Sequence, residues 1–414
     1  GAGDAGNITV KADAVSLTGG GHLTSSSVLP FGPDFPEFVP TGSAGTVSVQ
    51  GQHSPANSVL IDGPGSGIFT DTQGTGAGGS IFVNANTVTL QNGGTLSAAT
   101  SGTVPEAIGG TITIAATDVQ LSNGALVTAQ TTSAGNAGNI LVRADSVSIT
   151  GGAQITSSSL IGNSGEIPTG NAGTVTIQGL ASPAQSVLIT GFFDENFNPP
   201  IGGIFTETQG TGAGGTINIS ANEVHLSDGA TLSAKTSGSG KAGDIAIQAS
   251  QVTVDTSLIT AETTGLGNAG SISIVTSPSN STSNSITAAF AGPGDGIQIT
   301  DSSISTNTTG DGNAGTILLQ TTGNLSVSGS EMTSLAVPDM TQGFTGGRAG
   351  TIQLLASQDI SLTNSFITVQ TGGNKSGGEI VLNGNNLLVE GTSLLSHSVP
   401  AEGFTGGDAG NIRI

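Results

Sequence analysis

Residues 214–234 read GGTINISANEVHLSDGATLSA. Apolar side chains stand at every second position through Ile217–Ala221, Val224–Leu226 and Leu232–Ala234, with polar residues between them. A period of two is typical of β-strands that bury one face and leave the other in water. The stretch therefore predicts a unit of three short strands separated by polar corners.

A four-residue motif opens this unit and recurs along the whole chain. It consists of a small residue, Gly, any residue, and then Ile or Val; we call it the tetrad. The shortest distance between successive copies, from Ile245 to Ile272, is 27 residues, and longer intervals indicate inserted loops. The glycines of the thirteen copies are Gly6, Gly45, Gly79, Gly110, Gly138, Gly173, Gly215, Gly243, Gly270, Gly315, Gly350, Gly378 and Gly410.

Such a small unit cannot bury its apolar face alone. Stacked as successive coils, each strand would pair in parallel with its equivalent in the next coil, as in repeat proteins whose units contact mainly their neighbours. Separate β-sandwiches would need tight hairpins and would leave the aligned tetrads unexplained. We therefore predict an all-β, single-stranded parallel β-helix of about twelve coils, roughly 58 Å long at about 4.8 Å per coil. Residues 1–414 would form one continuous array.

The corners and insertions carry further expectations. A single Gly at every first corner indicates either a positive φ or a close approach to the neighbouring coil. Insertions are expected near 27–42, 190–203, 276–296 and 336–346, and most of the 13 Phe residues lie in or beside them. These Phe side chains could form an apolar contact site on the flank of the rod, or fold back over their own coils.

A longer repeat is superimposed on the coils. The segment QGTGAGG at Gln73–Gly79 returns at Gln209–Gly215, 136 residues later. This spacing predicts a super-repeat of four coils.

The composition excludes several classes of function. There is no Cys, which rules out disulfide scaffolds, Cys-ligated zinc and a thiol nucleophile. The 28 acidic and 7 basic residues give a net charge of −21, unsuited to nucleic acid or to an anionic membrane surface. No apolar run is long enough to span a bilayer, so we expect no membrane insertion.

A search for catalytic or metal-binding chemistry finds no site. Uronate-cleaving enzymes need carboxylates grouped with Arg or Lys, whereas Asp194, Glu195 and Asp301 are expected to form loops or corners. We therefore expect no catalytic, cofactor-binding or metal-binding residues; at this net charge, calcium could bind weakly to the surface. The groups considered were the cations Lys11, Arg143, Lys235, Lys241, Arg348, Lys375 and Arg413, the histidines His22, His53, His225 and His397, and the corner acids Asp4, Asp244 and Asp408.

The fuller motif GNAGNI at 135–140, followed by Ala144 and by VSITGGA at 147–153, resembles the repeats of filamentous-haemagglutinin-like exoproteins. These belong to the two-partner secretion systems of Gram-negative bacteria, and large cyanobacterial surface proteins carry similar repeats. The resemblance implies a right-handed shaft, export through a dedicated outer-membrane transporter, and an extracellular role in adhesion to a host surface, a neighbouring cell or a polysaccharide. The absence of Cys suits a chain threaded unfolded through a pore.

The sequence thus predicts the structural or adhesive shaft of a secreted surface protein or fibre, and not an enzyme. Two rivals are a carbohydrate-active β-helix enzyme and an ice- or surface-binding solenoid with outward Thr ladders. We expect residues 1–414 to be part of a longer shaft. Open strand edges at Ile8 and Ile412 would let copies associate head to tail into filaments.

Overall fold

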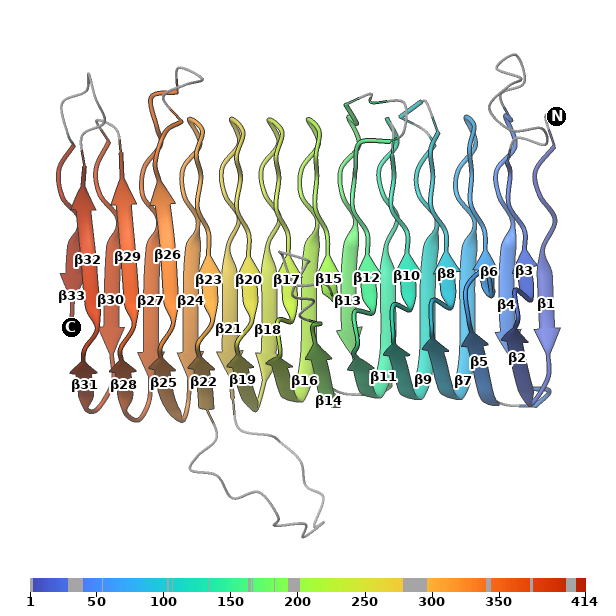
Figure 1. The fold of residues 1–414 in the computed structure, drawn as a ribbon, viewed down its shortest axis with the longest axis horizontal. Coiled ribbons are helices and arrows are strands. Elements are labelled where there is room, and N and C mark those ends of the chain that lie inside the picture. The colour runs from blue at the N-terminus through green and yellow to red at the C-terminus, as the bar shows by residue number, and fades with distance from the viewer. Residues whose placement is uncertain are drawn as a thin grey trace, which may run out of the picture.

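The computed structural model of the chain is all-β. It describes residues 3–28, 40–53, 55–102, 104–105, 107–132, 134–162, 165, 167–181, 183–192, 202–277, 296–339, 344–372, 375–399 and 407–414. The strands stack as parallel coils into a β-solenoid of about ten turns, seen from the side in Figure 1. The predicted all-β class and the parallel stacking of coils are confirmed. The expected insertions at 27–42, 190–203 and 276–296 lie largely outside the described residues, whereas at 336–346 only residues 340–343 lie outside them.

Two sheets run along the rod. No helix in the described ranges is long and apolar enough to cross a membrane. The larger sheet contains β1 (Ile8–Lys11), β2 (Ala14–Thr18), β4 (Thr46–Gln50), β5 (Ala56–Asp62), β7 (Ser80–Gln91), β9 (Thr111–Ser122), β11 (Ile140–Ile149), β13 (Thr174–Gln178), β14 (Ala184–Thr190), β16 (Thr216–Ser227), β18 (Ile245–Ala249), β19 (Gln251–Asp255), β21 (Ile272–Thr276), β22 (Gly296–Thr300), β24 (Thr316–Thr321), β25 (Asn324–Ser328), β27 (Thr351–Ala356), β28 (Ile360–Thr363), β30 (Glu379–Asn383), β31 (Leu387–Glu390) and β33 (Asn411–Arg413). The smaller sheet contains β3 (His22–Thr24), β6 (Gly67–Phe69), β8 (Thr95–Ser97), β10 (Leu126–Thr128), β12 (Gln154–Thr156), β15 (Gly203–Phe205), β17 (Thr231–Ser233), β20 (Leu258–Thr260), β23 (Ser303–Ser305), β26 (Glu331–Ala336), β29 (Phe366–Thr371) and β32 (Ser393–Ser398).

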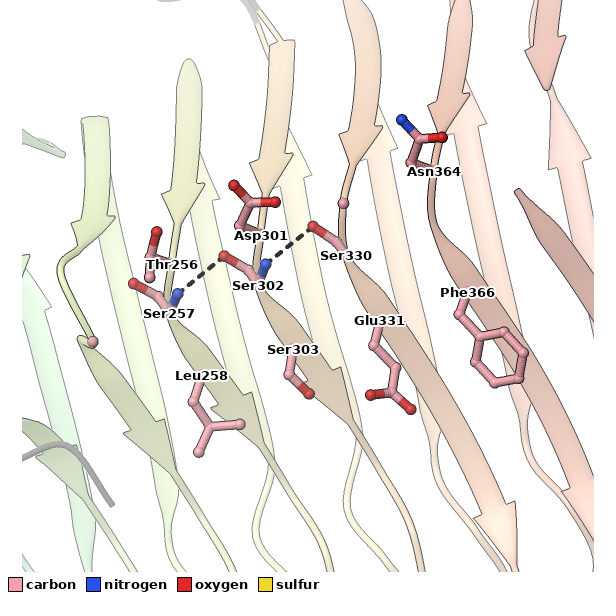
Figure 2. A pocket seen from close by; sticks show the side chains of 12 residues that line it. Thr256, Ser257, Leu258, Asp301, Ser302, Ser303, Ser330, Glu331, Asn364 and Phe366 are labelled. Carbon is pink, nitrogen blue, oxygen red and sulfur yellow. Dashed lines mark hydrogen bonds between the residues drawn. The ribbon is translucent and has the colours of Figure 1, made fainter. Parts of the chain in front are cut away.

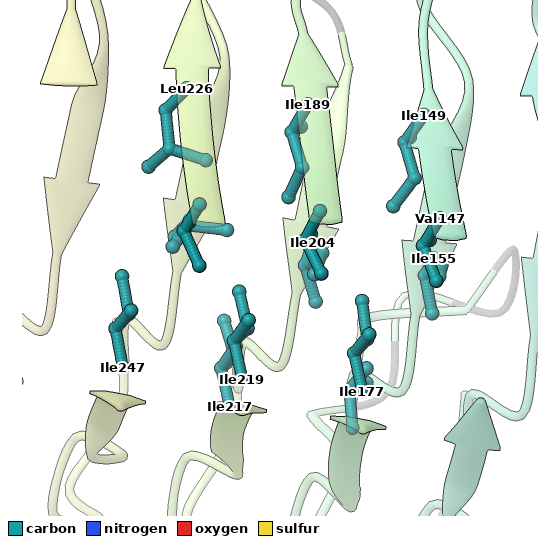
Figure 3. Close-up of a cluster of buried hydrophobic side chains, with 14 of the residues drawn as sticks. Val147, Ile149, Ile155, Ile177, Ile189, Ile204, Ile217, Ile219, Leu226 and Ile247 are labelled. Atoms are coloured by element: carbon teal, nitrogen blue, oxygen red, sulfur yellow. The ribbon is translucent and has the colours of Figure 1, made fainter. Parts of the chain in front are cut away.

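Register places like on like from coil to coil. In the β9–β11 pair, Ile112 lies opposite Ile140 and Ala116 opposite Ala144. The inward columns are almost fully buried, and Figure 3 shows part of them between the sheets. Each buried Ile, Val or Leu contributes roughly 1.5–3 kcal/mol of transfer free energy, so these columns supply most of the driving force for stacking.

The smaller sheet continues into an inner column of hydroxyl side chains. Thr72, Thr208 and Thr236 are buried, and each Oγ1 donates to a backbone carbonyl of the loop that leads to the next tetrad. A buried polar group is tolerated when it is hydrogen-bonded in this way. These hydrogen bonds therefore join the end of the smaller sheet to the loop that leads to the next tetrad.

The four-coil super-repeat is visible in the column two residues before these threonines. Its residues repeat in the order Ser, Thr, Ala, Ala through two cycles. They are Ser25, Thr70, Ala98 and Ala129, followed by Ser157, Thr206, Ala234 and Ala261.

One feature differs from the expected three separate strands. In β7, β9, β11 and β16 the first and second strands run together into one element of 10–12 residues. The pairing of β9 with β11 keeps one register across this corner: Ala116 lies opposite Ala144 and Asp118 opposite Ser146, and only the pair between them, Thr117 and Asp145, is skipped. The two strands that meet at the inward Ala therefore stay in register with the neighbouring coil.

The tetrad glycines are required by close approach and not by a positive φ. None of the thirteen has a positive φ. From Gly45 onwards, a Cβ added to any of them would overlap the carbonyl oxygen of the tetrad glycine one coil earlier, as at Gly243 over Gly215. Positive φ occurs instead at the second corner, for example at Asn123 (51°) and Asp228 (55°).

The Ile219→Asp substitution tests the inward frame. Ile219 is only 2% exposed, so a carboxylate there would be buried without a partner and should cost about 4 kcal/mol or more. Asn218→Asp, on the half-buried outward neighbour, should change stability little. Thermal unfolding and protease resistance would measure both, and equal stability of the two variants would contradict the frame.

Substitution Gly243→Val tests the close approach. A Val side chain must displace the backbone of the preceding coil, which should cost about 1–3 kcal/mol. The matched change is Gln248→Val on the exposed face of β18, which should be nearly silent. Urea unfolding of the two variants should therefore give clearly different midpoints.

Candidate functional site

The corner between the second and third strands changes length partway along the rod. In the coil of β16 and β17, six steps separate Leu226 from Leu232, and this corner contains Asp228 and Gly229, both with positive φ. The paired residues of the next coil, Val254 and Ile259, are only five steps apart. The corner is therefore one residue shorter from this coil onwards.

The short corners have their own sequence pattern. Each has one residue with positive φ, which is followed by Ser or Thr. The positive-φ residues are Thr256 (48°), Asp301 (47°), Gly329 (59°), Asn364 (49°) and Gly391 (59°), and the residues after them are Ser257, Ser302, Ser330, Ser365 and Thr392.

The hydroxyls after the short corners form a ladder parallel to the rod axis. The Ser257 N–H donates to Ser302 Oγ at 3.1 Å, and the Ser302 N–H donates to Ser330 Oγ at 3.1 Å (Figure 2). Each Oγ in turn donates to the carbonyl two residues earlier, as from Ser302 to Thr300 at 2.6 Å. In the long corners the backbone makes this closure itself, since the Ala230 N–H bonds to the Ser227 carbonyl.

A groove with a cavity volume of about 610 Å³ follows these short corners. It begins at Gly229, the last long corner, and extends to Asn364 and Phe366. The serine ladder forms the floor of the groove (Figure 2), and the serines of the ladder are buried. The volume is within the range typical of ligand pockets, about 300–1,000 Å³.

Two columns of side chains border the floor. The corner column contributes Thr256, Asp301 and Asn364, and the outward column of the smaller sheet runs in register as Leu258, Ser303, Glu331 and Phe366 (Figure 2). No Lys, Arg or His is among the lining residues within the described ranges. The groove thus combines two carboxylates, an amide and hydroxyls with apolar side chains at its two ends.

The sequence assigned Asp301 a corner role, and its φ of 47° agrees with that assignment. Its carboxylate lies close to Gly329 of the next corner, where a Cβ would overlap it. Glycine at 329 therefore leaves space for the Asp301 side chain at the rim of the groove. The sequence did not identify the groove itself, although the recurring Ser after the corner marks it.

The other candidate acids do not converge. The carboxylates of Asp4 and Asp244 each accept the N–H of the next coil, from Ser43 and Ser271, at 2.8 Å. Within the described residues there is no group of three or more His, Asp or Glu side chains that could hold a metal ion. Asp408 lies in a corner near the end of the rod, and Asp194 and Glu195 lie outside the described residues.

The histidines and cations are scattered along the rod. His53 and His225 are exposed, the His22 ring packs edge-on against Phe69, and His397 is half-buried. Three cations form ion pairs on the surface, Lys235 with Glu262, Lys241 with Asp244 and Arg413 with Glu379, at 3.2–3.6 Å. The remaining cations are Lys11, Arg143, Arg348 and Lys375, and none of them lines the groove.

A separate acid lies partly buried on the outer face of the smaller sheet. Burial raises the pKa of the Asp71 carboxyl, while hydrogen bonds from Ser97 Oγ at 2.5 Å and the Ala99 N–H at 2.9 Å lower it. Desolvation is the larger effect. The ionised form of Asp71 therefore opposes folding at neutral pH.

Comparison with known proteins identifies no relative: no family model, curated protein or solved structure matches the chain.

Removal of one hydroxyl from the floor tests the ladder. Ser302→Ala leaves the Ser257 N–H and the Thr300 carbonyl without this partner in a buried corner, which should cost about 1–3 kcal/mol. Ser303→Ala, one residue along on the outward column, should cost little. Thermal melting of both variants would check this, and a silent Ser302→Ala would show that the ladder contributes nothing to stability.

Asp71→Asn tests the effect of burial on the carboxyl. Because the folded-state pKa is raised, wild-type stability increases as the pH falls through that pKa and is lowest when Asp71 is ionised. The variant should melt higher than wild type at pH 7, and the difference should shrink as the pH approaches 4. Asp118→Asn, on the outward column of β9, is the control for the loss of one acidic charge.

Proposed function

We propose that this chain is the shaft of a secreted bacterial surface protein or extracellular fibre, with a structural and adhesive role. In this proposal the solenoid is right-handed and contains about twelve coils. The observation that carries it is the parallel, in-register pairing that continues from β1 to β33. Such an array gains length with each coil, because each coil contacts mainly its neighbours.

The composition supports an extracellular setting. The chain lacks Cys, and its net charge is −21. A chain without disulfides could be threaded unfolded through an outer-membrane transporter, as the resemblance to filamentous-haemagglutinin-like repeats implies. High negative charge would then keep the folded shaft soluble. The outer-membrane transporter and a surface or polysaccharide target are the partners that we propose.

The terminal coils support head-to-tail association as part of the same proposal. At one end Val389 and Ile412 are each 42% exposed, whereas Leu362 and Ile380, their paired residues one coil earlier, are fully buried. At the other end Ile8 is only partly buried. Further coils or another copy placed on these edges would extend both the ladder and the apolar columns.

One observation favours a second candidate, a carbohydrate-active enzyme: Asp301 and Glu331 line the same groove. The shaft is preferred because no cation lies with them among the described lining residues, whereas uronate-cleaving chemistry needs positive charge to stabilise the anion that develops.

Electron microscopy and light scattering across a salt series test the shaft. We expect rods at every ionic strength, with longer assemblies as salt screens the acidic surface. Compact particles would contradict the shaft, and short rods alone would contradict only the head-to-tail association. Turnover of polygalacturonate or alginate that is lost in Asp301→Asn would favour the enzyme instead.

A further inference from the structure

We propose that the groove along the short corners binds an extended chain of neutral β-linked sugars, lying parallel to the rod axis. Such a sugar chain would be the ligand of the adhesive shaft, and its extracellular source rests on the proposed function. Its binding would depend only on the residues of the groove.

The groove carries an exposed aromatic ring at one end. Phe366 is the first residue of β29 and lies on the wall of the groove. Its side chain points outward and is 41% exposed, whereas that of the next residue, Ile367, is buried. Its ring lies beside the space that Glu331 and Asn364 also border (Figure 2). A flat apolar ring beside polar groups suits the C–H face of a sugar, whose hydroxyls then reach the neighbouring side chains.

The rim of the groove carries polar groups that can hydrogen-bond to sugar hydroxyls. The serine floor is already hydrogen-bonded along the coil-to-coil ladder. The rim adds carboxylates at Asp301 and Glu331, which accept hydrogen bonds from sugar hydroxyls, and an amide at Asn364, which both donates and accepts. Successive coils therefore present different polar groups along one line.

The spacing between coils matches the spacing between sugar units. The outward column of the groove advances one coil at a time through Leu258, Ser303, Glu331 and Phe366. Coils in a parallel sheet are about 4.8 Å apart, which is close to the length of one unit in an extended β-linked polysaccharide. A sugar chain along the axis would meet one set of side chains per unit.

Other ligands fit the groove less well. Anionic polymers would be repelled by its two carboxylates, and the described residues contain no group of three acids or histidines to hold a cation. A basic peptide would match the charge but would leave the exposed ring of Phe366 without a role.

Calorimetric titration of the purified chain with hexasaccharides of β-1,4-glucose, β-1,4-mannose and β-1,4-N-acetylglucosamine tests the proposal. We expect saturable binding of at least one of them. Phe366→Ala should weaken it about tenfold, and Glu331→Gln should weaken it by a smaller factor. Phe82→Ala is the matched control because Phe82 is 43% exposed on β7 of the other sheet, and Glu223→Gln is the control for the carboxylate.

Several results would overturn the proposal. These are absence of binding to all three sugars, equal loss in Phe82→Ala and Phe366→Ala, and saturation by a Lys-rich peptide that displaces the sugars and is itself insensitive to Phe366→Ala. None of these results would affect rods seen by microscopy, so failure of the binding site is distinguishable from failure of the shaft. Circular dichroism of each variant would confirm that its coils remain folded.

Discussion

The coils can approach to strand-pairing distance because the tetrad corner carries no Cβ. The carbonyl oxygen of each tetrad glycine occupies the place that a Cβ of the next one would need. This contact allows neighbouring coils to approach to hydrogen-bonding distance at the corner as well as along the strands. Several other contacts depend on that spacing. They are the packing of the buried Ile, Val and Ala columns, the hydrogen bonds of the inner hydroxyls, and those of outer side chains such as Asp244, which accepts an N–H of the next coil.

The inward and outward frame could be predicted from the sequence because it follows directly from the period of two. Ile217, Leu226 and Leu232 were each assigned correctly to the interior. The extent of the strands could not be predicted in the same way. A polar corner residue signals a bend, but only the neighbouring coil decides whether the pairing register is kept across it, as it is between Ala116 and Asp118. For the same reason, the sequence left open whether Gly243 serves a positive φ or a close approach.

The groove was beyond the sequence argument. It depends on the loss of one residue from the corner between Val254 and Ile259, a change that the tetrad spacing does not reveal because loops of other lengths also vary. Asp301 was correctly assigned to a corner, but a single acid per coil gives no sign that Glu331 and Phe366 of later coils lie along the same line. Side chains far apart in sequence became neighbours only once the coil register was known.

The parallel ladder also determines how such a rod responds to mechanical load. Its inter-coil hydrogen bonds point along the long axis, so tension on the two ends would open them a coil at a time and leave the remaining coils intact. A unit such as the 27 residues from Ile245 to Ile272 would release about 90 Å of chain when it unravels. A tether built in this way would lengthen in steps and dissipate a pulling force gradually before it failed.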